Sequence, residues 1–105
     1  MGFYSKFILP RLIEGLGKGK EVTNIRALAI PNAAGAVLEL GIGSGLNLPF
    51  YSDKVKCLYG VDPSPELLCK AWARAAQVAF PVEFFNQSAE QLPLEDQSVD
   101  TVVST

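Results

Sequence analysis

A glycine-rich turn preceded by an acidic residue is the part of the chain whose residue types and spacing best suit ligand binding. Residues 39–45 read E-L-G-I-G-S-G, so glycine occurs at every second position from Gly41. Glycine tolerates positive φ and lets a ligand approach the backbone without obstruction from a Cβ atom. The amides exposed after such a turn can face an anionic or zwitterionic group. A purely structural turn between a strand and a helix has the same pattern, so that alternative stays open here.

A carboxylate at the expected end of the next strand is the second chemical feature. Asp62 lies 21 residues after Gly41. A carboxylate at this separation can accept hydrogen bonds from both hydroxyls of a ribose, as in other Rossmann-type sites. Because Pro63 and Ser64 follow, the alternative is that Asp62 serves only the start of a helix. Together, the turn and Asp62 predict a site for an adenosine-containing ligand.

The glycine spacing distinguishes two classes of such ligands. The dinucleotide fingerprint has its third glycine three positions after the second, which is position 46, where this chain has Leu46. This departure disfavours NAD and FAD and favours S-adenosylmethionine, which has no pyrophosphate to bind. A nucleotide-dependent oxidoreductase remains as a disfavoured alternative.

The elements that must position these residues follow from the hydropathy pattern. Ser64 and Pro65 predict the start of a helix that runs to about residue 78. The buried face is either Leu68, Trp72, Ala75 and Ala79 or the neighbouring one of Leu67, Ala71 and Val78. The helical spacing of Trp72 with Leu68 predicts that Trp72 lies in the core. Strands alternating with a helix indicate an α/β fold, a Rossmann-like parallel sheet of about four strands with flanking helices, covered on both faces. The expected strands are 36–40, 55–61, 82–85 and 99–103.

The first third of the chain is expected to be helical. Apolar residues recur at helical spacing within residues 3–16 and again within 21–30. We therefore expect residues 1–35 to form an N-terminal helical cap. Residues 36–105 are expected to form the N-terminal part of an S-adenosylmethionine-binding Rossmann-like domain, which is incomplete.

Composition excludes several function classes. The chain has 105 residues and a net charge of −2, which suits one small domain and gives no basic surface for nucleic acid. It has no histidine, and Cys57 and Cys69 lack metal-ligand spacing, so Cys/His zinc sites and Ser-His or Cys-His catalysis are excluded. No metal is expected. Charged residues interrupt the apolar stretch 3–16, so we expect no stable membrane insertion and a cytoplasmic location.

Three sequence motifs occur in an order and spacing that resemble a known family. They read V-L-E-L-G-I-G-S-G-L-N-L-P-F-Y, then V-D-P-S-P-E-L-L, then S-A-E-Q-L-P-L-E-D-Q-S-V-D-T-V-V-S. From about Ala36 to Thr105 the chain resembles the methyltransferase-11 type of class I S-adenosylmethionine-dependent methyltransferases. The resemblance implies methyl transfer by in-line displacement at the sulfonium methyl. The acceptor would be a small molecule or lipid-like, and this chain would supply the cofactor site.

The resemblance also implies roles for residues around the methionine end of the cofactor. Glu39 would orient the loop and, directly or through water, the cofactor's amino group. Gly41 and Gly43 would line the methionine moiety, and Asn47 and Leu48 would close the other side of that pocket.

Around the adenosine, the resemblance implies that Asp62 holds the ribose while Pro63 and Leu67 pack near the adenine. Ser88 and Ala89 would reach the adenine edge, with the Ala89 amide as a donor. Many relatives have Asp at the position of Ser88, and a hydroxyl makes a weaker contact than a carboxylate. No catalytic residue is assigned, because a general base is needed only if the acceptor must lose a proton.

The family's domain continues beyond the fourth expected strand, which suggests that this sequence is a fragment. We expect residues 101–104 to form a bare apolar edge that pairs with another chain across a two-fold axis, giving a homodimer. A non-catalytic cofactor-binding or assembly module is therefore the alternative from a different functional class.

Overall fold

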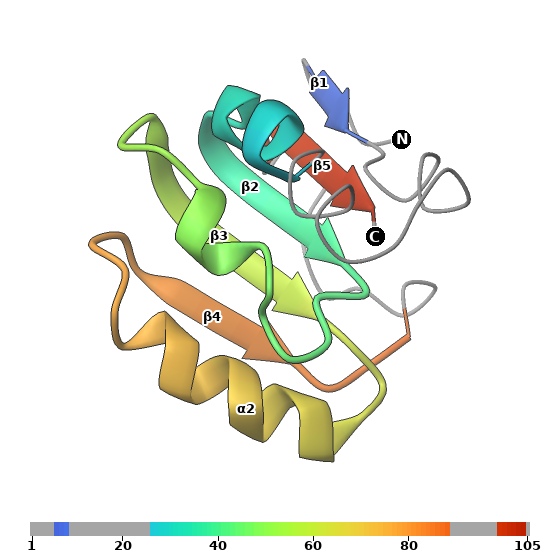
Figure 1. Cartoon of the computed structure of the whole chain (residues 1–105). Helices are drawn as coiled ribbons and strands as arrows, with labels where there is room; N and C mark the ends of the chain where they lie inside the picture. The colour runs from blue at the N-terminus through green and yellow to red at the C-terminus, as the bar shows by residue number, and fades with distance from the viewer. Residues whose placement is uncertain (1–5, 9–25, 89–98, 105) are drawn as a thin grey trace.

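A parallel β-sheet organises the part of the chain that the computed structural model describes, which is residues 6–8, 26–88 and 99–104. All neighbouring strands run parallel, and the sheet order is β1-β5-β2-β3-β4 (Figure 1). This arrangement confirms the predicted α/β class with a Rossmann-like parallel sheet. The strands are β1 (Lys6–Ile8), β2 (Gly35–Leu40), β3 (Val55–Val61), β4 (Val82–Phe85) and β5 (Thr101–Ser104).

Strand β2 is the centre of this sheet. It pairs with β3 on one side and with β5 on the other, so that Leu38 lies opposite both Tyr59 and Val102. Its consecutive residues Val37, Leu38 and Glu39 are all buried. Because successive side chains of a strand point to opposite faces, both faces of β2 are shielded from solvent, as its continuous apolar sequence predicts.

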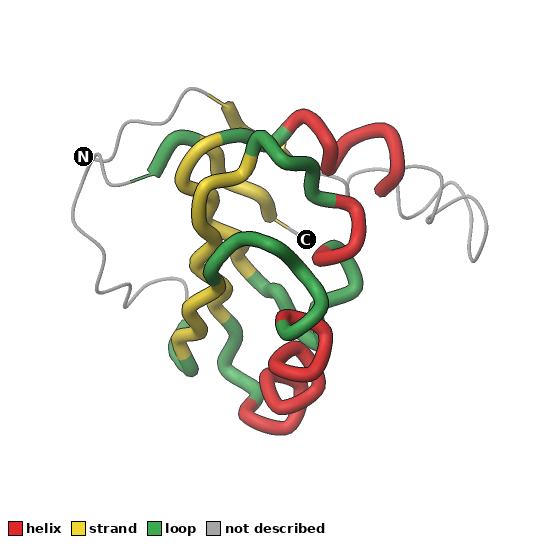
Figure 2. The backbone as a smooth tube through the Cα atoms, turned by 90° about the vertical axis from the view of Figure 1, so that its left-hand side faces the viewer, coloured by secondary structure: helices red, strands yellow, loops and turns green. Residues whose placement is uncertain are grey.

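The described helices pack on one face of the sheet (Figure 2). They are residues 26–29, the short 3₁₀ helices η2 (Ile30–Asn32) and η3 (Leu48–Phe50), and α2 (Pro65–Ala75). The core on this face is a single cluster of buried apolar side chains from these helices and from the strands. Its members are Ile30, Ala33, Val37, Ile42, Leu48, Tyr51, Val55, Leu58, Leu68 and Val103.

Helix α2 begins where its capping residues predict. The Ser64 hydroxyl accepts a hydrogen bond from the Leu67 amide at 3.3 Å, and Pro65 occupies the first helical position. The helix ends at Ala75, three residues before the predicted end. It faces the core with Leu68 and Ala71, which are one turn apart.

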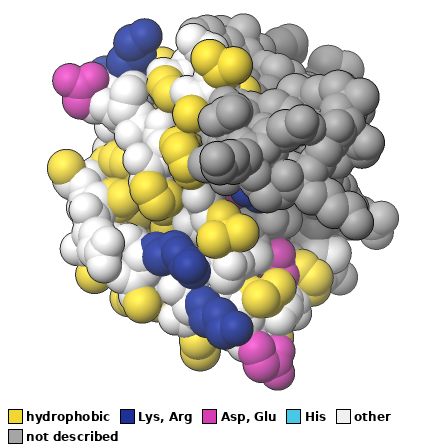
Figure 3. Space-filling view, in the orientation of Figure 1, with side chains coloured by type: hydrophobic (Ala, Val, Ile, Leu, Met, Phe, Trp, Pro, Cys, Tyr) yellow, Lys and Arg dark blue, Asp and Glu magenta, His cyan; other side chains and the backbone are white. Residues whose placement is uncertain are grey.

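The prediction that Trp72 lies in the core is wrong. Its side chain is 65% exposed, and its ring lies 5.6 Å from that of Phe84 on β4. Since Ala71 faces the core, its neighbour Trp72 is rotated about 100° away around the helix axis. On the side of the molecule seen in Figure 1, hydrophobic side chains lie among Lys and Arg side chains (Figure 3).

Residues 6–8 also differ from the sequence prediction, which placed them in a helical stretch. They form β1, which pairs with β5 so that Lys6, Phe7 and Ile8 lie opposite Thr101, Val102 and Val103. As an edge strand, β1 forms hydrogen bonds with the backbone groups of β5 that β2 leaves unpaired. The stability gained from this pairing of distant segments outweighs the local preference for a helix. The boundary predicted at residue 35 stays a prediction, although β1 belongs to the sheet and Gly35 to β2.

The premise of the predicted dimer is wrong for the same reason. β5 lies between β1 and β2, so residues 101–104 do not form the bare edge expected from the sequence. Dimer formation itself stays untested. Within the described ranges, no helix is long and apolar enough to cross a membrane.

Gly45 brings the turn after β2 into close contact with α2, and its replacement tests this packing. Gly45 has φ +84°, and a Cβ added to it would lie 2.8 Å from Leu48 Cδ1 and 3.2 Å from Ala71 Cα. We expect Gly45→Ala to lower the free energy of unfolding by roughly 3 kcal/mol, combining positive-φ strain with overpacking. Urea denaturation measures this loss.

Gly43→Ala is the matched control for this experiment. Gly43 also has positive φ, +58°, but an added Cβ would meet no atom closer than 3.8 Å. We expect it to cost only the backbone strain, about 1–2 kcal/mol. Equal losses in the two variants would contradict the close packing at Gly45.

Candidate ligand-binding site

The residues singled out in the sequence gather at the carboxyl ends of three adjacent strands. The glycine turn follows β2, Asp62 and Pro63 follow β3, and Ser88 lies three residues beyond β4 (Figure 1). The direction in which strands are added to the sheet reverses at β2: β3 and β4 follow it on one side, and β5 lies on the other. Ligands of open α/β sheets bind outside the carboxyl ends of the strands at such a switch point. Ala89 lies outside the described residues.

The turn itself has the backbone geometry that its glycines predict. Gly41, Gly43 and Gly45 have φ values of 71°, 58° and 84°. The amides of Gly41 and Ile42 both donate to the Val61 carbonyl oxygen, at 2.8 and 3.1 Å. The turn is therefore fastened to the last residue of β3, directly before Asp62.

Asp62 connects this turn to the start of α2. Its Oδ2 accepts a hydrogen bond from the Gly43 amide at 2.9 Å, and its Oδ1 accepts one from the Ser64 amide at 2.9 Å. Asp62 therefore supports the start of α2 and also holds the turn, so it does not serve the helix alone, while its bond to a ribose stays a prediction. A carboxylate has about four lone-pair sites, so these two bonds leave acceptor capacity for a ligand.

The space beside Gly43 would admit one more carbon atom at ordinary contact distances. The nearest atoms to an added Cβ would be Leu67 Cδ1 at 3.8 Å, the Gly41 carbonyl oxygen at 3.9 Å and Asp62 Oδ2 at 4.0 Å. Pro63 and Ser88 are both exposed near this edge of the sheet, so they are accessible to a ligand. The structure thus brings Gly43, Asp62 and Leu67 together, and the roles that the resemblance implies for them stay predictions.

Glu39 is a buried carboxylate at the end of β2, and it is only 1% exposed. Tyr51 Oη donates to its Oε1 at 2.6 Å, and Asn47 Nδ2 donates to its Oε2 at 2.9 Å. Arg26 Nε in turn donates to Asn47 Oδ1 at 2.8 Å. These bonds join Glu39 to the residues that follow the turn, while its role toward the cofactor stays a prediction.

Burial dominates the electrostatics of this group. Desolvation raises the pKa of Glu39 from 4.5 to about 7, while the bonds from Tyr51 and Asn47 and the charge of Arg26 oppose that rise. Burial and the neighbouring Glu39 also raise the pKa of Tyr51 well above its usual value of 10. The Tyr51 hydroxyl therefore keeps its proton and acts as a donor at neutral pH.

Sequence reasoning missed three residues that hold this site. Arg26 and Tyr51 belong to the hydrogen bonds around Glu39, and Arg74 Nη1 on α2 donates to the Ser44 carbonyl oxygen at 2.8 Å. Tyr51 is the last residue of the N-L-P-F-Y stretch in the first motif, so its position in that motif could have identified it as a site residue. Arg26 and Arg74 contact the turn across 21 and 30 residues of sequence, and no local pattern indicates such contacts.

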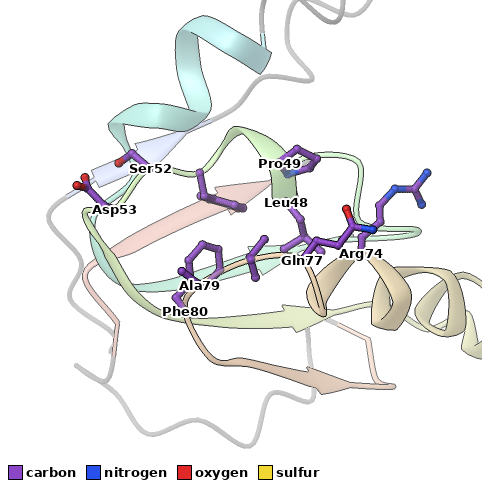
Figure 4. A pocket seen from close by; sticks show the side chains of 10 residues that line it. Leu48, Pro49, Ser52, Asp53, Arg74, Gln77, Ala79 and Phe80 are labelled. Carbon is purple, nitrogen blue, oxygen red and sulfur yellow. The ribbon is translucent and has the colours of Figure 1, made fainter.

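A cavity of about 450 Å³ lies beside the site, between η3 and the C-terminal end of α2 (Figure 4). Of the predicted site residues in the described chain, Leu48 alone lines it. The cavity is therefore distinct from the glycine turn, although two of its lining residues also bond near the turn, Tyr51 to Glu39 and Arg74 to Ser44. The cavity is lined by Leu48, Pro49, Tyr51, Ser52, Asp53, Arg74, Gln77, Val78, Ala79 and Phe80.

Among the described residues, no group of three or more His, Cys, Asp or Glu side chains is placed to hold a metal ion.

The chain is similar in sequence to a known protein family and to several curated proteins. A sequence family described as a methyltransferase domain matches residues 37–105. The phosphatidylethanolamine N-methyltransferase of Cereibacter sphaeroides is 40% identical over 91 residues, covering 84% of this chain and 44% of that protein. An uncharacterised protein of Mycobacterium tuberculosis is 36% identical over 69 residues, covering 65% of this chain and 25% of that protein. The chain thus spans less than half the length of these curated relatives.

A solved structure supports the same fold. The YcgJ protein of Bacillus subtilis superposes with a TM-score of 0.60 at 32% sequence identity, covering 69% of this chain and 31% of that one.

Replacement of Glu39 by Gln tests the buried carboxylate. The folded protein retains a proton on Glu39 up to about pH 7, whereas the unfolded chain releases it near pH 4.5. The contribution of Glu39 to stability is therefore fully present below pH 4.5 and is lost as the pH rises through 7. At about 1.4 kcal/mol per pKa unit, the loss is on the order of 3 kcal/mol. Glu39→Gln, measured by urea denaturation at pH 5 and pH 8, should lose this pH dependence.

The exposed carboxylate of Glu83 on β4 is the matched control. Glu83→Gln should retain the wild-type decrease in stability between the two pH values. A Glu39→Gln variant with the same pH dependence as the wild type would show that Glu39 is not the group responsible.

Proposed function

The chain belongs to the methyltransferase domain family, and from this premise we propose that it binds S-adenosylmethionine at the glycine turn and Asp62. The observation that carries the proposal is the 2.9 Å hydrogen bond between the Gly43 amide and the Asp62 carboxylate. It joins the two features that the ligand needs, a turn open to its methionine end and an acceptor for its ribose hydroxyls. We further propose methyl transfer to a small-molecule or lipid-like acceptor.

The residues present fit this cofactor. At Gly43 an added Cβ would make only ordinary contacts, the nearest at 3.8 Å, so there is room beside the turn for a further carbon atom. Asp62 is 8% exposed and keeps acceptor capacity for the ribose hydroxyls. Gly41 and Asn47 would flank the methionine moiety, while Pro63, Ser88 and Ala89 would flank the adenine.

The same site disfavours the oxidoreductase alternative. A dinucleotide fingerprint uses its third glycine to bring helix and strand close together. Leu46 occupies that position here, and its side chain is 48% exposed at the end of the turn. A cofactor without pyrophosphate fits this geometry better than NAD or FAD.

When bound, S-adenosylmethionine supplies a methyl group already activated by its sulfonium. The residues of this chain would bind the cofactor, fix its orientation and exclude water, since alignment is the main contribution a protein makes to such a displacement. An acceptor amine with a free lone pair requires no general base.

The acceptor class is supported by one relative. The Cereibacter protein is described as a phosphatidylethanolamine N-methyltransferase, and its acceptor is an amine on a lipid headgroup. We propose a lipid-like amine as the acceptor class for the protein that contains this chain, and a cytoplasmic location for the reaction. A non-catalytic cofactor-binding module remains the alternative from another functional class. Cofactor binding without methyl transfer by the complete protein would favour it.

Calorimetric titration of S-adenosylhomocysteine into wild type and Asp62→Asn tests the proposed cofactor. The substitution preserves shape but removes the charge that the ribose hydroxyls would bond to. A hydrogen bond to a charged group contributes about 1.5–3 kcal/mol, so Kd should rise by roughly 30-fold.

Asp53→Asn is the matched control, because Asp53 is an exposed carboxylate outside the predicted site. It should bind like the wild type, and NAD should bind neither variant. Unchanged affinity in a folded Asp62→Asn variant would overturn the assignment of Asp62. Tighter binding of NAD than of S-adenosylhomocysteine would overturn the proposed cofactor.

A further inference from the structure

Four side chains form a hydrogen-bonded chain behind the glycine turn, which we call the buried network: Arg26, Asn47, Glu39 and Tyr51. Arg26 donates to Asn47, and Asn47 and Tyr51 both donate to Glu39. Glu39, Asn47 and Tyr51 are 1%, 2% and 9% exposed, so the bonds are shielded from water. The amide orientation of Asn47 is fixed from both sides, since its oxygen accepts from Arg26 while its nitrogen donates to Glu39.

The buried network holds both ends of the turn. Glu39 lies two residues before Gly41, and Asn47 lies two residues after Gly45. The bond between Asn47 Nδ2 and Glu39 Oε2 therefore joins the two stems, which are eight residues apart in sequence. The conformation of the glycines between them depends on this closure.

A contribution to stability does not account for the buried network. Burying a charged group costs free energy, and well-packed apolar side chains of similar volume are often as stabilising or more so. A network retained at this cost, and placed at both stems of a ligand-binding turn, indicates a role in positioning the turn.

We propose that Tyr51 and Arg26 are positioning residues of the cofactor site, with Tyr51 acting through Glu39 and Arg26 acting through Asn47. The inference rests on the proposed function of the turn as a cofactor site. Because Arg26 belongs to the helical residues 26–29, the buried network also makes the turn sensitive to the placement of that helix.

The charge state of Glu39 decides how well the buried network closes the turn. A deprotonated Glu39 accepts from both Asn47 and Tyr51 at the observed distances. A protonated Glu39 would instead donate its O–H to Tyr51 Oη, since a phenolic hydroxyl also accepts, and both bonds would lose the strength that the charge gives them. Cofactor affinity should therefore fall when Glu39 takes up a proton.

The charge state of Glu39 is set by its burial and by the side chains around it. Burial raises the pKa of Glu39, and the bonds from Tyr51 and Asn47 and the positive charge of Arg26 lower it. The residues paired with Glu39 on β3 and β5 are Gly60 and Val103, which carry no titratable group. Removal of the Tyr51 hydroxyl or the Arg26 charge should therefore raise the pKa of Glu39 further.

The test is calorimetric titration of S-adenosylhomocysteine from pH 6 to pH 9 into the wild type, Tyr51→Phe and Arg26→Met. Phenylalanine retains the ring, which packs edge-on against Phe80 with a centroid distance of 6.0 Å, and removes only the hydroxyl. We expect Kd at pH 7 to rise about tenfold in each variant, the equivalent of one charge-assisted hydrogen bond. The pH at which half of the affinity is lost should move upward in both variants.

Two further variants complete the design. Tyr59→Phe removes a hydroxyl from β3, outside the buried network, and should leave both Kd and its pH dependence unchanged. Arg26→Lys retains the positive charge and should recover part of the affinity lost in Arg26→Met.

The outcomes separate this inference from the proposed function. A wild-type chain that binds no S-adenosylhomocysteine would overturn the proposed function and the inference with it. A wild type that binds, with Tyr51→Phe and Arg26→Met matching it in Kd and pH profile, would overturn the inference alone. Weaker binding without a shift in the pH profile would also overturn it. Such a result would mean that the substitutions only disturb the structure and do not act through the charge of Glu39. If Tyr51→Phe does not fold, Arg26→Met decides the matter.

Discussion

The parallel register between β2 and β3 is the constraint on which the candidate site depends. Leu40 lies opposite Val61, so the chain leaves both strands at the same edge of the sheet and at the same height. The next residues are Gly41 and Asp62, and the Val61 carbonyl accepts the first two amides of the turn. A shift of one residue in this register would turn every side chain of β2 to the other face and separate the turn from Asp62.

Around this edge, polar groups anchor the turn from separate elements. Asp62 holds Gly43 from the end of β3, Arg74 holds Ser44 from α2, and the buried network holds Asn47 from β2 and the helical residues 26–29. Glycines make the turn conformationally free in the unfolded chain, so its order in the folded protein must come from such contacts. The site is thus a flexible sequence fixed by its surroundings.

The accuracy of sequence-based prediction varied with the range of the interactions involved. Strands β2 to β5 fall within two residues of their predicted bounds, because each is a short, largely apolar run bounded by turn-forming residues. Ser64 and Pro65 located the start of α2, since capping is decided by residues next to each other. The three residues of β1 and the exposure of Trp72 were predicted wrongly, because both depend on which neighbours the element meets in the folded protein.

The sequence by itself determined the type of fold, the positive-φ turn and the acidic residue at the end of the next strand. These features are local: they follow from hydropathy runs, glycine spacing and the separation of Gly41 from Asp62. Only the tertiary structure decided that β5 has a partner on each side and that Gly43 bonds to Asp62. It also decided that Glu39 is buried between Tyr51 and Asn47, with Arg26 completing the chain. Burial and long-range hydrogen bonding are properties of the packed chain, so no stretch of sequence read alone could have fixed them.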